Sequence, residues 1–280
     1  MQPDGSVKVG TFADVARRSA QLAHALRDCG VTGDERVATL MWNNQEHVEA
    51  YCAVPSMGAV LHTLNPRLTP EQLIYIANHA DDRVVIVDGT LAPLLGAVLP
   101  HLAGVRTVVV TGAVDLAPLQ REGLNVVAYE EFIAGRPETF DWPELDEFSA
   151  AAMCYTSGTT GNPKGVMLSF YNMAYAAEGG MEVLGVSSEE RMLSYLPLAH
   201  VFERTFVELA SLYAGFHLYF AESLDTFVQD LQRAQPTLFL SVPRLWVKFQ
   251  HGVLQKLPKK KLDRLLKIPV VNKLIKKKIL

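Results

Sequence analysis

Arg83-Val84-Val85-Ile86-Val87 and Val105-Arg106-Thr107-Val108-Val109-Val110 are two runs dominated by β-branched residues. Neither run alternates regularly between apolar and polar residues, as a strand with one face in water would. Runs of this kind are typical of strands that are buried on both faces of a sheet. They therefore predict a sheet that is covered by helices on both sides.

Helical patterns surround these two runs in the sequence. Thr11 is a predicted N-cap, apolar residues follow it at helical spacing, and Gly30 ends the helix. Thr69 and Pro70 begin another helix, since proline loses no hydrogen bond at the first helical position. A short apolar strand is predicted at residues 37–41. Strands separated by helices imply parallel pairing with crossover helices, so the predicted class is α/β with layered sheets.

The composition of the chain changes near its middle. Residues 1–135 are predicted to form a first α/β subdomain, and residues 136–148, rich in Pro, Glu and Asp, a linker. Residues 149–280 are then predicted to form a second α/β subdomain. Five strands are expected in it, at residues 151–156, 166–169, 192–196, 217–220 and 238–242. A helix is expected after the second of these strands and extends to about residue 184.

The overall composition is that of a globular protein, with 49% hydrophobic and 20% charged residues. No stretch reaches the roughly 20 uninterrupted apolar residues that a membrane span needs. The first ten residues lack the apolar core of a signal peptide. The three cysteines, Cys29, Cys52 and Cys154, have no paired spacing, so we expect a reducing, cytoplasmic location.

Positive charge is concentrated at the end of the sequence. Residues 256–280 contain ten Lys or Arg and one Asp, whereas the remaining residues contain 16 basic and 29 acidic side chains. This tail has no aromatic residue, which argues against a nucleic-acid partner. Two interpretations stay open: the solvated face of a helix, or peripheral contact with an anionic membrane such as the inner face of the cell membrane.

A glycine-rich stretch between two predicted strands is the main candidate for chemistry. It reads Tyr155-Thr156-Ser157-Gly158-Thr159-Thr160-Gly161-Asn162-Pro163-Lys164-Gly165. Glycines allow close backbone approach, successive N–H groups can bind anionic oxygens, and the hydroxyls and the lysine suit a polyphosphate. A Walker A loop would open a helix directly after its lysine, and here β-type residues follow. By composition alone, a hairpin without a ligand and a phosphate-binding loop are equally good interpretations.

The order of these residues resembles the signature of the AMP-forming adenylating superfamily, which includes the acyl-CoA synthetases. The resemblance implies that the chain is part of the large N-terminal domain of the adenylate-forming fold. It also implies that the loop binds the phosphates of ATP and that Lys164 supports catalysis. The residues it assigns to the phosphates are Thr156, Ser157, Gly158, Thr159, Thr160, Gly161 and Lys164, and Thr156 is also assigned to Mg²⁺.

A second match narrows the family. Residues 195–204, YLPLAHVFER, resemble the LPLAH-x-x-ER segment of long-chain fatty acyl-CoA synthetases. The resemblance places His200 beside the approach of the carboxylate and the thiol, as a catalytic residue. The alternative is a histidine that caps a strand-to-helix turn. Glu203 and Arg204 are interpreted as a structural pair one turn into the next helix.

Weaker matches extend along most of the chain. SVPRLWVKF, residues 241–249, resembles the element beside the acyl tunnel, so Val242, Pro243 and Arg244 are candidates for the acyl pocket. Several early segments also resemble medium-chain fatty-acid ligases, which leaves the preferred chain length open.

The resemblance implies an ATP-dependent fatty-acid–CoA ligase whose partners are a fatty acid, ATP and CoA, with Mg²⁺. Two alternatives remain: an adenylation domain with another acceptor, against which YLPLAHVFER argues, and a non-catalytic nucleotide- or lipid-binding remnant. The family's later Tyr-Gly-x-Thr-Glu and Thr-Gly-Asp segments do not occur in these 280 residues. We therefore expect a truncated chain, without the rest of the large domain and the small C-terminal domain, that makes no acyl-CoA alone.

Overall fold

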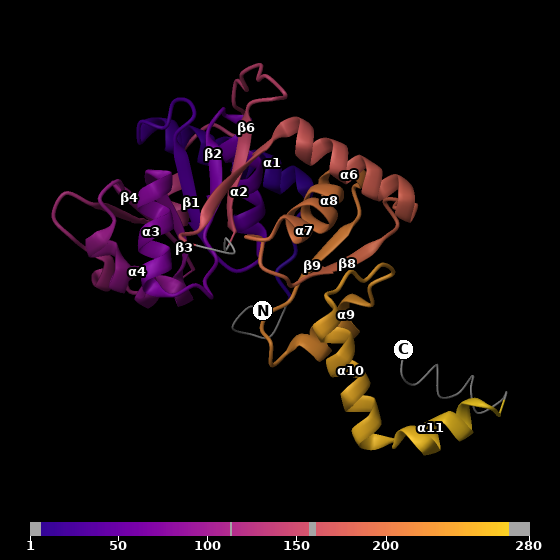
Figure 1. The fold of residues 1–280 in the computed structure, drawn as a ribbon. Helices are drawn as coiled ribbons and strands as arrows, with labels where there is room; N and C mark the ends of the chain where they lie inside the picture. Colours follow the sequence, from indigo (N-terminus) through magenta and orange to yellow (C-terminus); the bar gives the residue numbers. More distant parts are fainter. Residues whose placement is uncertain (1–6, 113, 157–160, 269–280) are drawn as a thin grey trace. The chain divides into compact units, whose positions relative to one another are not determined.

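The computed structural model describes residues 7–112, 114–156 and 161–268. The chain divides into two compact units, Met1–Thr237 and Leu238–Leu280, which are described separately. Figure 1 shows the course of the chain and labels most of the elements used below.

The main sheet of the first unit has the strand order β5-β4-β3-β1-β2-β6-β7. Neighbouring strands are parallel, except that β7 runs antiparallel to β6. This confirms the predicted α/β class with a mostly parallel sheet. The strands are β1 (Arg36–Leu40), β2 (Val60–Thr63), β3 (Asp82–Asp88), β4 (Thr107–Thr111), β5 (Asn125–Ala128), β6 (Ala150–Thr156) and β7 (Lys164–Ser169).

Helices cover both faces of this sheet. α1 (Phe12–Asp28) and α2 (Gln45–Ser56) pack on one face, and α3 (Pro70–Ala80) and α4 (Ala92–Val98) pack on the other (Figure 1). α5 (Tyr129–Ile133) packs with α1 and α2. Successive residues of β3 enter opposite cores, because Ile86 packs with α1 and α2 whereas Val85 and Val87 pack with α3 and α4. The continuous apolar run in β3 is therefore explained by burial on both faces.

The predicted starts of two helices are confirmed. Thr11 caps α1 in a capping box with Asp14, and Thr69 caps α3 in a capping box with Gln72, with Pro70 at the first helical position. In each box a side-chain oxygen accepts from an N–H group that has no partner within the helix. Short 3₁₀ turns at Gly89–Leu91, Leu99–His101 and Ala117–Leu119 complete the loops around β3, α4 and β4.

The sequence suggested that the strands beside the glycine-rich loop begin a second α/β layer. In the structure these strands instead extend the first sheet. β6 pairs in parallel with β2, with Leu61 opposite Ala152 and His62 opposite Met153. The reason is that β6 completes the hydrogen bonding of β2, which would otherwise be an edge. Residues 136–148 thus do not separate two sheets, and the subdomain boundaries stay a prediction.

A smaller arrangement follows in the same unit. α6 (Phe170–Leu184) leads to β8 (Arg191–Ser194), which pairs in parallel with β9 (His217–Phe220). Between these strands lie α7 (Val201–Glu203), a π-helical segment (Arg204–Leu209) and α8 (Ala210–Ala214), and α9 (Phe227–Ala234) follows β9.

The second unit contains α10 (Pro243–Lys256) and α11 (Lys259–Leu266). The strand predicted at residues 238–242 is wrong, because this segment has no regular structure before Pro243 begins α10. A strand needs a neighbour for its N–H and C=O groups, and no described strand pairs with it. None of the helices in the described ranges combines the length and apolarity needed to cross a membrane. Residues 269–280 of the basic tail lie outside the described residues, so its contact with a membrane stays a prediction.

Candidate functional site

The glycine-rich loop joins β6 to β7 in an antiparallel pair. Thr156, the last residue of β6, lies opposite Lys164, the first residue of β7. Both residues are exposed, and Gly161 has a φ of 88°, a left-handed conformation that favours glycine. Ser157, Gly158, Thr159 and Thr160 lie outside the described residues, so their assignment to the phosphates stays a prediction.

The described ends of this loop fit a Mg²⁺–polyphosphate group. Cross-strand partners project from the same face of a sheet, so the hydroxyl of Thr156 and the ammonium of Lys164 point to the same side. Among described residues, no group of three or more His, Cys, Asp or Glu side chains could bind a metal ion. Mg²⁺ commonly takes one or two protein oxygens and completes its shell with phosphates and water. Thr156 could supply one such oxygen.

His200 lies directly before α7, with an exposed side chain. Its backbone N–H donates to the carbonyl of Pro197 at 3.0 Å. The alternative of a capping histidine is wrong, because its side chain makes no hydrogen bond to the first turn of α7. The backbone turn therefore fixes the position of His200 and leaves its imidazole exposed.

The residues that precede His200 contact the first sheet and α7. We call residues 194–200 the histidine segment. Asn43 Nδ2 donates to Ser194 Oγ and to the carbonyl of Leu196, both at 2.8 Å. From the other side, Glu203 Oε1 accepts from Ser194 Oγ at 2.7 Å and from the N–H of Tyr195 at 3.0 Å.

Glu203 and Arg204 do not pair with each other, which corrects the sequence interpretation. Successive residues of a helix point in different directions, so Glu203 contacts the histidine segment and Arg204 contacts the main sheet. Burial raises the pKa of the Glu203 carboxyl to about 7. Arg204 is 1% exposed, and its guanidinium donates to Tyr51 Oη at 2.9 and 3.1 Å and to Thr63 Oγ1 at 3.0 Å.

Sequence reasoning missed Asn43, Tyr51 and Thr63 as neighbours of the histidine segment. They precede it by more than 130 positions in the chain. One usable signal was present, since the tyrosine of α2 and the threonine that ends β2 need hydrogen-bond partners when they are buried.

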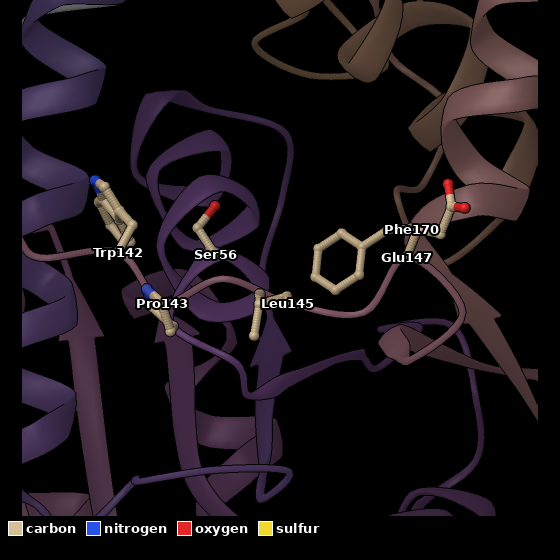
Figure 2. A pocket seen from close by; sticks show the side chains of 6 residues that line it. All are labelled: Ser56, Trp142, Pro143, Leu145, Glu147 and Phe170. Atoms are coloured by element: carbon tan, nitrogen blue, oxygen red, sulfur yellow. The ribbon is translucent and has the colours of Figure 1, made fainter.

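Two pockets of the first unit lie beside the linker residue Trp142, and neither is lined by a residue predicted for the site. One, of about 420 Å³, is lined by Ser56 of α2, Phe170 of α6 and four residues of the linker, Trp142, Pro143, Leu145 and Glu147 (Figure 2). A second, of about 300 Å³, shares Ser56 and Trp142 with it. Val242, Pro243 and Arg244 lie at the start of α10 in the second unit, and their place in an acyl pocket stays a prediction.

Comparison with known proteins gives a consistent result. The profile of the family described as AMP-binding enzyme matches residues 5–272. The 3-methylmercaptopropionyl-CoA ligase of Ruegeria pomeroyi is 44% identical over 201 residues, which cover 71% of this chain and 37% of that protein. The long-chain-fatty-acid–CoA ligase of Thermus thermophilus is 42% identical over 199 residues, which cover 70% of this chain and 35% of that protein.

Solved structures agree with the sequence relatives. An anthranilate–CoA ligase in complex with anthranoyl-AMP matches with a TM-score of 0.76 and 25% identity, over 85% of this chain and 45% of that chain. ATP-bound MatB from Rhodopseudomonas palustris matches with a TM-score of 0.69 and 24% identity over the same shares. The chain spans less than two fifths of the length of both curated relatives named above.

Proposed function

Because this chain belongs to the family of AMP-binding enzymes, with acyl-CoA ligases among its relatives, we propose that the protein joins a carboxylic acid to CoA at the expense of ATP. In the first step a carboxylate oxygen bonds to the α-phosphorus and pyrophosphate leaves. In the second step the CoA thiolate bonds to the acyl carbon and AMP leaves. The observation that carries the proposal is the cross-strand placement of Thr156 and Lys164 at the two ends of the glycine-rich loop.

The residues of this chain contribute position and charge rather than a covalent nucleophile. Lys164 places an ammonium where it can neutralise negative charge on the phosphates, and the hydroxyl of Thr156 would bind Mg²⁺, which neutralises further charge when bound. His200, with an imidazole exposed at the start of α7, would orient the carboxylate or shape the approach of the thiol. Positioning and charge neutralisation of this kind account for most of the catalysis in such phosphoryl chemistry.

We propose a fatty acid as the substrate, since residues 195–204 resemble the corresponding segment of long-chain fatty acyl-CoA synthetases. The long-chain ligase of Thermus thermophilus, at 42% identity, supports this class. A second candidate is a short acid with a thioether, because a 3-methylmercaptopropionyl-CoA ligase is 44% identical. The two candidates differ in the length of apolar pocket that they require.

Because residues 1–280 are expected to make no acyl-CoA alone, the test uses a purified chain that also carries the family's Tyr-Gly-x-Thr-Glu and Thr-Gly-Asp segments and its small C-terminal domain. Release of pyrophosphate and formation of thioester are measured with ATP, Mg²⁺ and CoA. Hexadecanoate, octanoate and 3-(methylthio)propanoate are supplied in parallel. Preference for either straight-chain acid supports the fatty-acid proposal, and preference for the thioether acid supports the second candidate. Nucleotide binding without pyrophosphate release on any acid would contradict both and would favour a binding protein.

A further inference from the structure

The guanidinium of Arg204 is buried, and one charge that acts on it is the buried carboxyl of Glu208, which lies beyond salt-bridge distance. Within the part of the chain that the structure describes, Arg204 has no ion pair within 4 Å, although it is 1% exposed. Buried cations are normally paired, because removing a charge from water costs several kcal/mol. Arg204 donates only to two neutral hydroxyl oxygens, those of Tyr51 and Thr63. Arg204 thus directs its hydrogen bonds to two hydroxyls and not to Glu208, which indicates a positioning role.

The direction of these hydrogen bonds is fixed by chemistry. Arginine can only donate and a backbone carbonyl can only accept. The hydroxyl of Tyr51 lies 2.9 Å from the carbonyl of Leu198 and accepts from Arg204, so its single proton must go to Leu198. The Thr63 hydroxyl, 2.7 Å from Tyr51 Oη, therefore donates to Tyr51. A positive charge next to a donating hydroxyl strengthens the bond that the hydroxyl donates.

Leu198 lies two residues before His200, within the turn closed by the hydrogen bond from the His200 N–H to the Pro197 carbonyl. Asn43 and Glu203 bind the first half of the histidine segment, and Tyr51 binds its second half at the carbonyl of Leu198. The guanidinium also lies 4.9 Å from the centroid of the Tyr51 ring, which restrains the ring itself. The position of His200 thus depends on Tyr51, and that of Tyr51 on Arg204.

We propose that Arg204 and Tyr51 are positioning residues that fix His200 for the reaction by polarising and orienting the hydrogen bond to the Leu198 carbonyl. This inference rests on the proposed function, because it assigns a purpose to the position of His200. The π-helical segment fits this role, since its first residue is Arg204, which reaches Thr63 at the end of β2. π-Helical turns are frequent at functional sites.

The test uses Tyr51→Phe and Arg204→Met in the full protein, with Arg204→Lys as the conservative variant. Arg18→Met is the matched control, since Arg18 is a partly buried arginine that binds Glu49 and Glu130 and does not touch the histidine segment. Two readouts are followed: hydrogen exchange of the amides of residues 195–200, and kcat and KM for thioester formation. Each variant is also made in a His200→Ala background.

We expect Tyr51→Phe to accelerate exchange in the histidine segment by about tenfold or more, while Arg18→Met leaves it unchanged. We expect kcat to fall about tenfold or more with little change in KM, and this loss to disappear when His200 is already alanine. Arg204→Lys should restore part of kcat. If Arg204→Met fails to fold, Tyr51→Phe decides, because it removes one oxygen only.

Unchanged exchange in Tyr51→Phe would overturn the inference, and so would an equal loss of kcat with and without His200. If the unmodified protein forms no thioester with any acid, the proposed function fails separately. The exchange measurement then still decides whether Tyr51 and Arg204 fix the histidine segment.

Discussion

Thr156 lies opposite Lys164 across the pair of β6 and β7, so the residue that enters the glycine-rich loop is the cross-strand neighbour of the residue that leaves it. Cβ atoms of such neighbours are about 5 Å apart. The hydroxyl of Thr156 and the ammonium of Lys164 therefore lie on the same side of the two loop ends, at a spacing that suits adjacent oxygens of one polyphosphate.

Replacing the lysine at this position tests its charge. In a chain completed with the family's later segments, we expect Lys164→Ala to lower the rate of pyrophosphate release by about 10²-fold or more, because negative charge that develops on the phosphates is no longer neutralised. The control is Lys8→Ala, which removes the other lysine described in the first unit, one that pairs with Glu46. A rate within about twofold of the unmodified protein would exclude Lys164 from the mechanism.

Two adjacent glycines of α6 give a test of packing against the π-helical segment. A Cβ atom on Gly180 would lie 2.6 and 2.7 Å from ring atoms of Phe206, whereas a Cβ atom on Gly179 would meet nothing within 4 Å. We expect Gly180→Ala to destabilise the protein by about 1–3 kcal/mol through overpacking. Gly179→Ala should stabilise it by about 0.5–1 kcal/mol through helix propensity. Urea unfolding measures both, and equal effects of the two changes would contradict the contact with Phe206.

The buried carboxyl of Glu203 predicts a pH dependence of stability. Its pKa of about 7 lies above the ordinary value of 4.5, so between these values the unfolded state releases a proton that the native state retains. The free energy of unfolding therefore falls as pH rises through this window, by roughly 3 kcal/mol from this group.

Glu203→Gln isolates the contribution of that carboxyl. The amide keeps an oxygen that can accept from Ser194 and Tyr195, and it cannot ionise. We expect the variant and the unmodified protein to differ little near pH 4.5, and the variant to be the more stable by roughly 3 kcal/mol above pH 7. Urea unfolding across this range measures the difference, and parallel curves at every pH would contradict the raised pKa.

A buried His–Asp pair is the subject of a further prediction. His62 Nδ1 lies 2.9 Å from both carboxylate oxygens of Asp82, and both side chains are fully buried. We expect Asp82→Ala to cost about 3–5 kcal/mol of unfolding free energy, because it leaves a buried imidazole without its partner. The exposed Asp34 provides the control, Asp34→Ala, which should change stability by less than about 0.5 kcal/mol. A cost for Asp82→Ala as small as that of the control would contradict the prediction.

The sequence predicted the elements whose signals are local. The caps at Thr11 and Thr69 and the strand around Ile86 were found because a cap or a β-branched run is readable within a few residues. The pairing of β2 with β6 was missed because nothing in either strand identifies its partner across some 90 residues.

The candidate site shows the same division. The loop from Thr156 to Lys164 and His200 were selected by their residue order, and their roles stay predictions, whereas the pairing of Arg204 with Glu203 was wrong. A helical arginine beside a glutamate suggests a local pair, and only the folded chain brings Tyr51 and Thr63 to its guanidinium. Partners of buried polar groups are set by tertiary packing, which no short pattern records.

The burial of β3 on both faces affects how the register of this strand against its neighbours is determined. Val84, Val85, Ile86 and Val87 all suit either core, so sliding the strand by one residue would exchange one branched side chain for another at little hydrophobic cost. Apolar burial thus hardly distinguishes one strand register from another in the centre of this sheet. The information must come from a group that tolerates only one neighbour, and Asp82, at the start of β3 with its carboxylate on His62, is such a group. In this strand a single polar contact therefore fixes the register in which the hydrophobic residues are buried.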